Sequence, residues 1–168
     1  ITISLILFKP YLLTRATISD QAVTERVQYN QIGLKMIKAN PIFGVGAGES
    51  VLHMEQYSPT NLEPWQKQPI HNYFLLSAAE LGIPGALILI LIFLSNLKSL
   101  ILNLKSSTDL RLATYYLLLT TILTCFLILM LFDHYFYTLQ QTQVLLWILL
   151  GIIATQKNHL TKDGFTDN

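Results

Sequence analysis

Charged residues are scarce in this sequence. Asp, Glu, Lys and Arg together make up 12% of the 168 residues, whereas 52% are hydrophobic. A soluble domain is typically about a quarter charged, and a chain of this composition could not hide its apolar surface from water. The composition therefore excludes an ordinary soluble domain and predicts a protein whose solvent is largely a lipid bilayer.

Three further absences narrow the class. The net charge is only +1, which gives no reason to expect nucleic acid or another polyanion as a partner. Cys125 is the single cysteine, so an intrachain disulfide is excluded and the redox compartment is not readable. The chain opens inside an apolar run and without methionine, which we interpret as the end of a truncated membrane helix over residues 1–13, not as a signal peptide.

Long apolar runs with little or no charge predict further membrane-spanning helices. These runs cover residues 73–97, where Glu80 is the one charged residue, and the uncharged ranges 112–132 and 135–155. A spanning helix needs about 20 predominantly apolar residues, which each run approaches or reaches. Basic residues lie in the loop 98–111 and in the tail 156–168, and none lies in the turn at Asp133 and His134. Because short cytoplasmic loops are enriched in Lys and Arg, that turn is expected on the outer side.

The predicted organisation is an all-α polytopic membrane bundle with one large external loop. Its segments are 1–13 (end of a truncated span), 14–72 (periplasmic or extracellular loop), 73–97 (span), 98–111 (cytoplasmic loop), 112–132 (span), 133–155 (external turn and span) and 156–168 (cytoplasmic tail).

The external loop contains a predicted amphipathic helix at about residues 20–39. Ser19 and Asp20 suit its N-cap, and Pro41 suits its end. Apolar residues fall on one half of a helical wheel, with Ile32 as the main exception, so the helix is expected on the bilayer or on the membrane bundle. Arg26 falls near the middle of the apolar half, where a guanidinium costs free energy unless an anion or several acceptors meet it.

A glycine-rich segment follows this helix. Gly44, Gly46 and Gly48 alternate with other residues, but no strand precedes them and the spacing GxGxxG of a dinucleotide loop is not met. A tight turn that brings the backbone close to a ligand or a helix is therefore the preferred interpretation.

Two motifs carry a resemblance to a known family. Arg26 is followed by Pro-x-x-Gly-x-Gly at residues 41–46, and His71-Asn72 is followed after nine residues by Gly82 and then by Gly85. Over roughly residues 20–95 the chain resembles the O-antigen ligase-related family, which includes O-antigen ligases, Wzy-type O-antigen polymerases and protein O-oligosaccharyltransferases.

The resemblance extends beyond these motifs in one place and departs from the family pattern in another. Residues 132–151 look like the C-terminal end of one branch of the family. Many members carry Trp four residues after the arginine, whereas this chain has Asn30 there. No subgroup is therefore assigned.

The resemblance implies a glycosyltransferase with a GT-C-like membrane bundle. Its donor would be an oligosaccharide on undecaprenyl diphosphate, and its acceptor a hydroxyl of a glycan, a lipid or a protein. The reaction would be inverting, would use neither a cofactor nor a metal, and would take place at the outer face of the bacterial cytoplasmic membrane, in lipopolysaccharide or other cell-surface polysaccharide biosynthesis. Membrane lipids would be further partners, and the oligomeric state is not predicted.

Two residues are the main candidates for this chemistry. Arg26 would bind the lipid diphosphate, because a guanidinium presents a permanent charge and a planar fork to phosphate oxygens. Alternatively, it snorkels to lipid phosphates or meets a helix C-terminus. His71 would activate the acceptor hydroxyl, since a neutral imidazole accepts a proton near pH 7. On a helix it would share a face with Leu75, Ala78 and Gly82, where small residues would let a neighbouring helix pack close and hold the ring in place. Alternatively, its ring bonds a free backbone amide at the start of a helix.

Four polar residues are supporting candidates. Asn72 is expected to cap the following helix. Glu80, at the edge of the membrane, is expected to pair with Arg26 or Lys35 or to support His71. Asp133 and His134 either join the site or anchor a short turn.

No metal site is predicted. Glu49 and His53 have a helical i, i+4 spacing, but no third ligand follows at a suitable distance.

Two other classes of protein remain open. A transporter or flippase for lipid-linked sugars would bind the same groups without making a bond, but transporters tend to place ionisable residues at the bilayer midplane. A structural membrane subunit would leave Arg26 and His71 apart and replaceable.

Overall fold

The computed structural model describes residues 20–162, with side chains over residues 23–156. The helices are α2 (Asp20–Ala39), α3 (Ser50–Tyr57), the 3-10 helix η1 (Pro64–Gln66), α4 (Tyr73–Ser106), α5 (Leu110–Phe132), α6 (Tyr135–Thr138) and α7 (Gln140–Lys162). Within this range the chain contains no strand, which confirms the predicted all-α class. Residues 1–13 and Ser19, for which a truncated span and an N-cap were predicted, lie outside the described residues.

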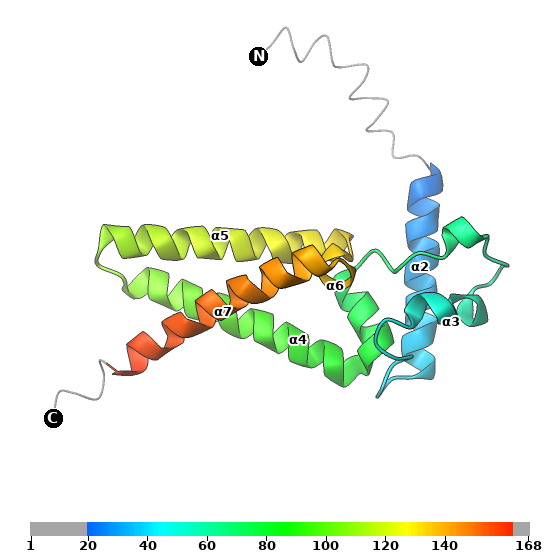
Figure 1. Cartoon of the computed structure of the whole chain (residues 1–168), viewed down its shortest axis with the longest axis horizontal. Helices are drawn as coiled ribbons and strands as arrows, with labels where there is room; N and C mark the ends of the chain where they lie inside the picture. The colour runs from blue at the N-terminus through cyan, green and yellow to red at the C-terminus, as the bar shows by residue number, and fades with distance from the viewer. Residues whose placement is uncertain (1–19, 163–168) are drawn as a thin grey trace, which may run out of the picture.

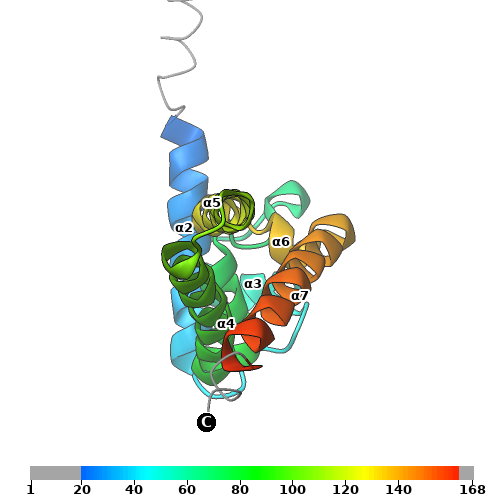
Figure 2. The same cartoon turned by 90° about the vertical axis from the view of Figure 1, so that its left-hand side faces the viewer.

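The helices form a bundle with a crosspiece at one end. Figure 1 shows α5 running beside the long part of α4, with α7 crossing them, while α2 stands across the end where α4 begins and α5 finishes. The view along the bundle in Figure 2 shows α2 on one side of α4 and α7 on the other. The core of the bundle contains Phe93, Leu123, Met130 and Leu146.

Two of the described helices, α4 and α5, are long and apolar enough to cross a bilayer. Their outer surfaces keep large apolar side chains exposed, among them Leu91 and Leu118. Such surfaces suit lipid tails, whereas in water they would be unfavourable.

The helix boundaries around these spans differ from the sequence prediction. Helix α4 continues to Ser106, through most of the predicted loop 98–111. The charge of the lysines there predicted a loop, but lysine does not end a helix. Asp109 caps the next helix by accepting a hydrogen bond from the amide of Arg111 at 2.9 Å. The loop between the two helices is therefore short.

The predicted run 135–155 is divided in the structure. Helix α6 ends at Thr138, and α7, which begins at Gln140, is not one of the two described helices that are long and apolar enough to cross a bilayer. Side chains stabilise the break: Gln143 donates to the carbonyl of Tyr137, and Thr142 donates to that of Leu139. Gln143 therefore caps α6, and the apolar span does not extend through this break.

Helix α2 has the predicted bounds but a different buried face. Tyr29, Ile32 and Met36 pack into a core with residues of α3 and α4, and Ile32 is 0% exposed. Val27 and Leu34, predicted on the apolar half, are 49% and 57% exposed. Ile32, the exception on the helical wheel, is thus at the centre of the buried face. Helix α2 packs through a narrow line of residues spaced three and four apart.

Helix α4 is kinked at Gly82, and the glycine-rich turn supplies hydrogen bonds that the kink removes from the helix. Gly82 has φ 74° and ψ 173°. In a regular helix the carbonyl of Glu80 would accept a hydrogen bond from the amide four residues later, but that residue is Pro84, which has no N–H. The amides of Val45 and Gly46 instead donate to the carbonyls of Ala79 and Glu80 at 2.8 and 3.0 Å. In return, the amide of Ile83 donates to the carbonyl of Pro41 at 2.8 Å.

Glycine is required on both sides of this contact. A Cβ added at Gly44 would lie 2.3 Å from the backbone of Glu80, and one added at Gly82 would lie 2.2 Å from the carbonyl oxygen of Ile42. Both residues also have positive φ, a region that side chains disfavour. The structure therefore confirms the predicted tight turn against a helix and explains the spacing of the two glycine motifs.

Candidate functional site

Asn72 fixes the start of α4 and its position relative to α5. Its Oδ1 accepts a hydrogen bond from the amide of Leu75 at 2.8 Å, and its Nδ2 donates to the carbonyl of Leu131 at 2.9 Å. The predicted cap is confirmed. The sequence had suggested that His71 shares a helical face with Leu75. Because the helix begins at Tyr73, His71 instead precedes the cap and lies outside the helix.

The His71 imidazole is held by two aromatic contacts. It stacks on Tyr29 of α2, with ring centroids 5.6 Å apart and an angle of 17°, and meets His134 edge to face at 5.1 Å and 77°. Its Nδ1 atom is buried and has no hydrogen-bond partner among the described residues. For Nδ1, therefore, the alternative of a bond to a free backbone amide does not apply.

The surroundings keep His71 neutral near pH 7. Burial lowers its pKa from the ordinary value of 6.5, the carboxylate of Asp133 raises it, and the positive charge of Arg26 lowers it further. The net shift is downward, so the unprotonated imidazole prevails at neutral pH. An imidazole in this state can accept a proton.

His134 and Asp133 lie on the other side of the His71 ring. Asp133 Oδ1 lies 3.8 Å from His134 Nε2, and His134 Nδ1 is 2.7 Å from the hydroxyl of Thr138. Burial lowers the pKa of His134, and Asp133 opposes that shift. Besides forming the turn before α6, His134 therefore contacts the His71 ring, and the charge of Asp133 acts on it.

Arg26 lies on the exposed part of α2, not on its buried face. Its guanidinium makes no hydrogen bond or ion pair with the part of the chain that the structure describes. Its charge is nevertheless near enough to lower the pKa of His71. The structure thus brings Arg26, His71, Asp133 and His134 to one end of the bundle.

Glu80 has a different environment from the one predicted. It is 2% exposed, and its carboxylate accepts hydrogen bonds from the amides of Gly48 at 2.6 Å and Ser50 at 3.3 Å. The predicted partner Lys35 instead donates to the carbonyl of Tyr57 at 3.1 Å, and no described contact joins Glu80 to Arg26. Backbone amides can stabilise a buried carboxylate in place of a cation.

Tyr137 completes the surroundings of Glu80. Its phenol lies beside the Glu80 carboxylate at the same cavity, and burial followed by the nearby negative charge raises the pKa of this phenol. Glu80 therefore joins the glycine-rich turn, α4 and α6 at one point. Sequence reasoning missed this role because nothing in the spacing of residues 48, 80 and 137 reveals it.

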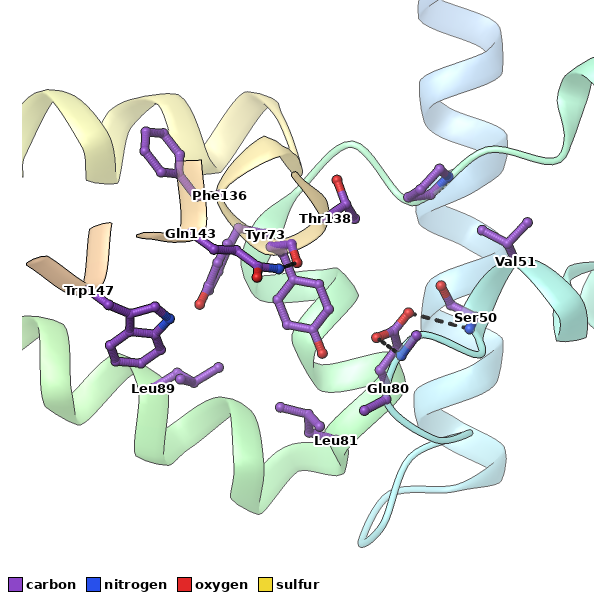
Figure 3. Close-up of a pocket in the computed structure, with 14 residues that line it drawn as sticks. Ser50, Val51, Tyr73, Glu80, Leu81, Leu89, Phe136, Thr138, Gln143 and Trp147 are labelled. Atoms are coloured by element: carbon purple, nitrogen blue, oxygen red, sulfur yellow. Dashed lines mark hydrogen bonds between the residues drawn. The ribbon is translucent and has the colours of Figure 1, made fainter. Parts of the chain in front are cut away.

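A cavity of about 590 Å³ lies beside this carboxylate. Figure 3 shows Ser50 and Glu80 on one side of it and Phe136 and Trp147 on the other, with Tyr73 between them. No sequence pattern distinguishes these aromatic residues, because in an apolar chain they resemble ordinary core or membrane-interface residues.

The described residues contain no group of three His, Cys, Asp or Glu side chains arranged to hold a metal ion. Glu49 is the N-cap of α3 and His53 lies within that helix. Neither takes part in the cluster around His71.

Comparison with known proteins places the two motifs in one family. The family model described as O-antigen ligase matches residues 2–90, more than half of the chain. The matched region contains Arg26, the glycine-rich turn, His71 and Glu80. A search of curated proteins and a search of solved structures each found no match.

Proposed function

Since the chain belongs to the O-antigen ligase family, whose members carry out ligase- or polymerase-type glycan transfer, we propose that it moves a glycan from an undecaprenyl-diphosphate-linked donor to an acceptor hydroxyl. The observation that carries this proposal is the contact of the His71 ring with His134 and with Tyr29 of α2, the helix that also carries Arg26. The site contains both groups that such a transfer requires, a proton acceptor and a cation for a departing diphosphate.

The proposed reaction is a direct displacement at the anomeric carbon of the donor sugar. The acceptor hydroxyl gives its proton to a His71 nitrogen, and its oxygen forms the new bond to that carbon. The bond between the carbon and the diphosphate oxygen breaks, and its electron pair leaves with undecaprenyl diphosphate. One displacement inverts the anomeric configuration, and no step requires a metal.

His71 suits the part of proton acceptor. Its Nδ1 is buried and has no hydrogen-bond partner among the described residues, whereas Nε2 is not in that situation. We therefore assign Nε2 as the nitrogen that receives the proton of the acceptor hydroxyl. Stacking on Tyr29 restricts motion of the ring out of its own plane, whereas hydrogen bonds to the ring nitrogens act within that plane. Asp133 acts in the proposal as the charge that stabilises the imidazolium formed during transfer.

Arg26 suits the part of diphosphate ligand. Its guanidinium is exposed and unpaired among the described residues, and a bidentate guanidinium neutralises a developing phosphate charge better than an ammonium does. Position along α2 also supports this role, because Tyr29, one turn further along, contacts His71.

The proposed site faces outward from the cytoplasmic membrane. His71 and His134 lie at the end of the bundle where α4 begins and α5 finishes, whereas Lys98, Lys105 and Arg111 lie towards the other end (Figure 1). Short cytoplasmic loops are enriched in basic residues. This distribution supports a reaction at the outer face, in cell-surface polysaccharide biosynthesis.

The test compares Arg26→Ala and Arg26→Lys in a transfer assay on membranes containing the full-length protein and a lipid-linked donor. Loss of a charge-assisted hydrogen bond costs about 1.5–3 kcal/mol, so Arg26→Ala should lower the rate about 10- to 100-fold, with partial activity in Arg26→Lys. Lys38→Ala is the matched control, because Lys38 is an exposed cation on the same helix. Equal rates for Arg26→Ala and Lys38→Ala would remove Arg26 from the mechanism, and an absence of transfer by the unmodified protein would favour a transporter.

A further inference from the structure

The cavity between α3, α4, α6 and α7 has no part in the displacement described above. Its volume of about 590 Å³ falls within the range of small-molecule sites. Its lining combines aromatic side chains with a few polar groups, as such sites do. A pyranose has the matching chemistry, with apolar C–H faces that pack on aromatic rings and hydroxyls that hydrogen-bond at its edge.

Ser50 provides the first observation that points to a ligand. It is 2% exposed, and its Oγ has no hydrogen-bond partner in the described part of the chain. Buried hydroxyls are nearly always hydrogen-bonded in folded proteins. Ser50 lines the cavity next to the Glu80 carboxylate, as Figure 3 shows, so a hydroxyl entering from the cavity would meet both groups.

Glu80 provides the second observation. Two backbone amides hydrogen-bond to its carboxylate, which has about four acceptor positions in all. Acceptor capacity therefore remains on a carboxylate that lines the cavity. Across from it, Trp147 is 49% exposed and offers an aromatic surface with an N–H donor at its edge.

The cavity adjoins the His71 cluster on the side away from Arg26. Pro69 and Tyr73, which flank His71 in sequence, both line it. Thr138 also lines it, and its hydroxyl is 2.7 Å from His134 Nδ1. Arg26 is not among the lining residues and approaches His71 from α2 instead.

We propose that this cavity binds the sugar that accepts the glycan, and that it selects a neutral or amino sugar over an acidic one. The proposal rests on the transfer function proposed above. Among the described residues that line the cavity, Glu80 is the only charged one, so an acidic sugar would face a carboxylate without a compensating cation. The donor diphosphate then occupies the Arg26 side and the acceptor the Trp147 side of His71.

The experiment is a saturation-transfer NMR titration of the full-length protein in nanodiscs with methyl glycosides of glucose, glucosamine and glucuronic acid. We expect saturable signals from the first two and none from the glucuronide at the same concentrations. Ser50→Ala and Trp147→Leu should each weaken binding of the methyl glucoside about tenfold. Trp65→Leu, which replaces an exposed tryptophan outside the cavity, should leave it unchanged.

Each outcome decides between the two proposals. The absence of saturable binding, equal binding of the glucuronide, or unchanged binding in both Ser50→Ala and Trp147→Leu would overturn the acceptor pocket even if glycan transfer is observed. Binding as expected without any transfer would retain the cavity as a sugar-binding site but reject its acceptor role together with the transfer function. Melting curves distinguish a role of Ser50 in ligand binding from a structural role. Ser50→Ala removes no hydrogen bond, so it should not lower the melting temperature.

Discussion

The rings of His71 and His134 meet edge to face with their centroids 5.1 Å apart. His71 lies just before α4 and His134 just after α5, so the hairpin of these two helices brings the rings together. The hydrogen bond from Asn72 to the carbonyl of Leu131 fixes the same two helix ends at 2.9 Å. The geometry of the site therefore depends on the register of the membrane helices.

Replacement of Asn72 tests this dependence. Asn72→Ala removes a helix cap and the bond to α5, so we expect a loss of about 1–2 kcal/mol in stability together with slower glycan transfer. Thermal unfolding in detergent and the transfer assay measure the two effects. Asn61→Ala, in an exposed loop, is the control, and an Asn72 variant as stable as that control would contradict the assignment.

The glycine contact between the turn and the α4 kink predicts a graded response to alanine. Gly44→Ala and Gly82→Ala combine a backbone clash with positive φ, and the conformational strain alone is of order 1–3 kcal/mol. Both should fold poorly and lose transfer. Gly48→Ala has positive φ but open space, so its loss should be smaller, and Gly151→Ala has neither and should be tolerated. Equal expression and melting temperatures of all four variants would refute this explanation of the motif.

Much of this arrangement was predictable because short-range signals determine it. The bounds of α2, its end before Pro41 and the capping role of Asn72 follow from local backbone chemistry. The buried position of Ile32 does not, because the direction from which a neighbouring helix packs is not encoded in the helix itself. The role of Glu80 was missed for a similar reason, since its partners are backbone amides of a distant turn and carry no residue-specific signal.

Glu80→Gln tests whether the turn depends on a carboxylate. A glutamine amide offers one oxygen where two backbone N–H groups now have acceptors, so one amide would lose its partner at a cost of about 1–3 kcal/mol. We expect a lower melting temperature and faster proteolysis in the turn. Glu55→Gln removes only an exposed ion pair with Lys67 and should change little. A Glu80 variant that melts with the Glu55 variant would show that the carboxylate is dispensable.

The pH profile of transfer reports the ionisation of His71. The pKa of His71 lies below 6.5, so transfer should be constant near pH 7 and fall as the pH drops through that lower value and the base becomes protonated. Asp133 raises the pKa of His71, so Asp133→Asn should lower that pKa and move the acid limb of the profile to lower pH. Glu63→Gln, which changes the exposed carboxylate at the N-cap of η1, should not move it. A shift to higher pH in Asp133→Asn would contradict the electrostatics of the cluster.

The most direct test of the central proposal is glycan transfer by His71→Ala in membranes that contain the full-length protein at matched expression. Loss of a positioned general base typically lowers the rate about 10²- to 10⁴-fold, and we expect a loss of that size in product formation from the lipid-linked donor. His53→Ala, on α3 and outside the cluster, should transfer at the unmodified rate. Transfer by His71→Ala at the rate of the His53 variant would show that His71 does not activate the acceptor.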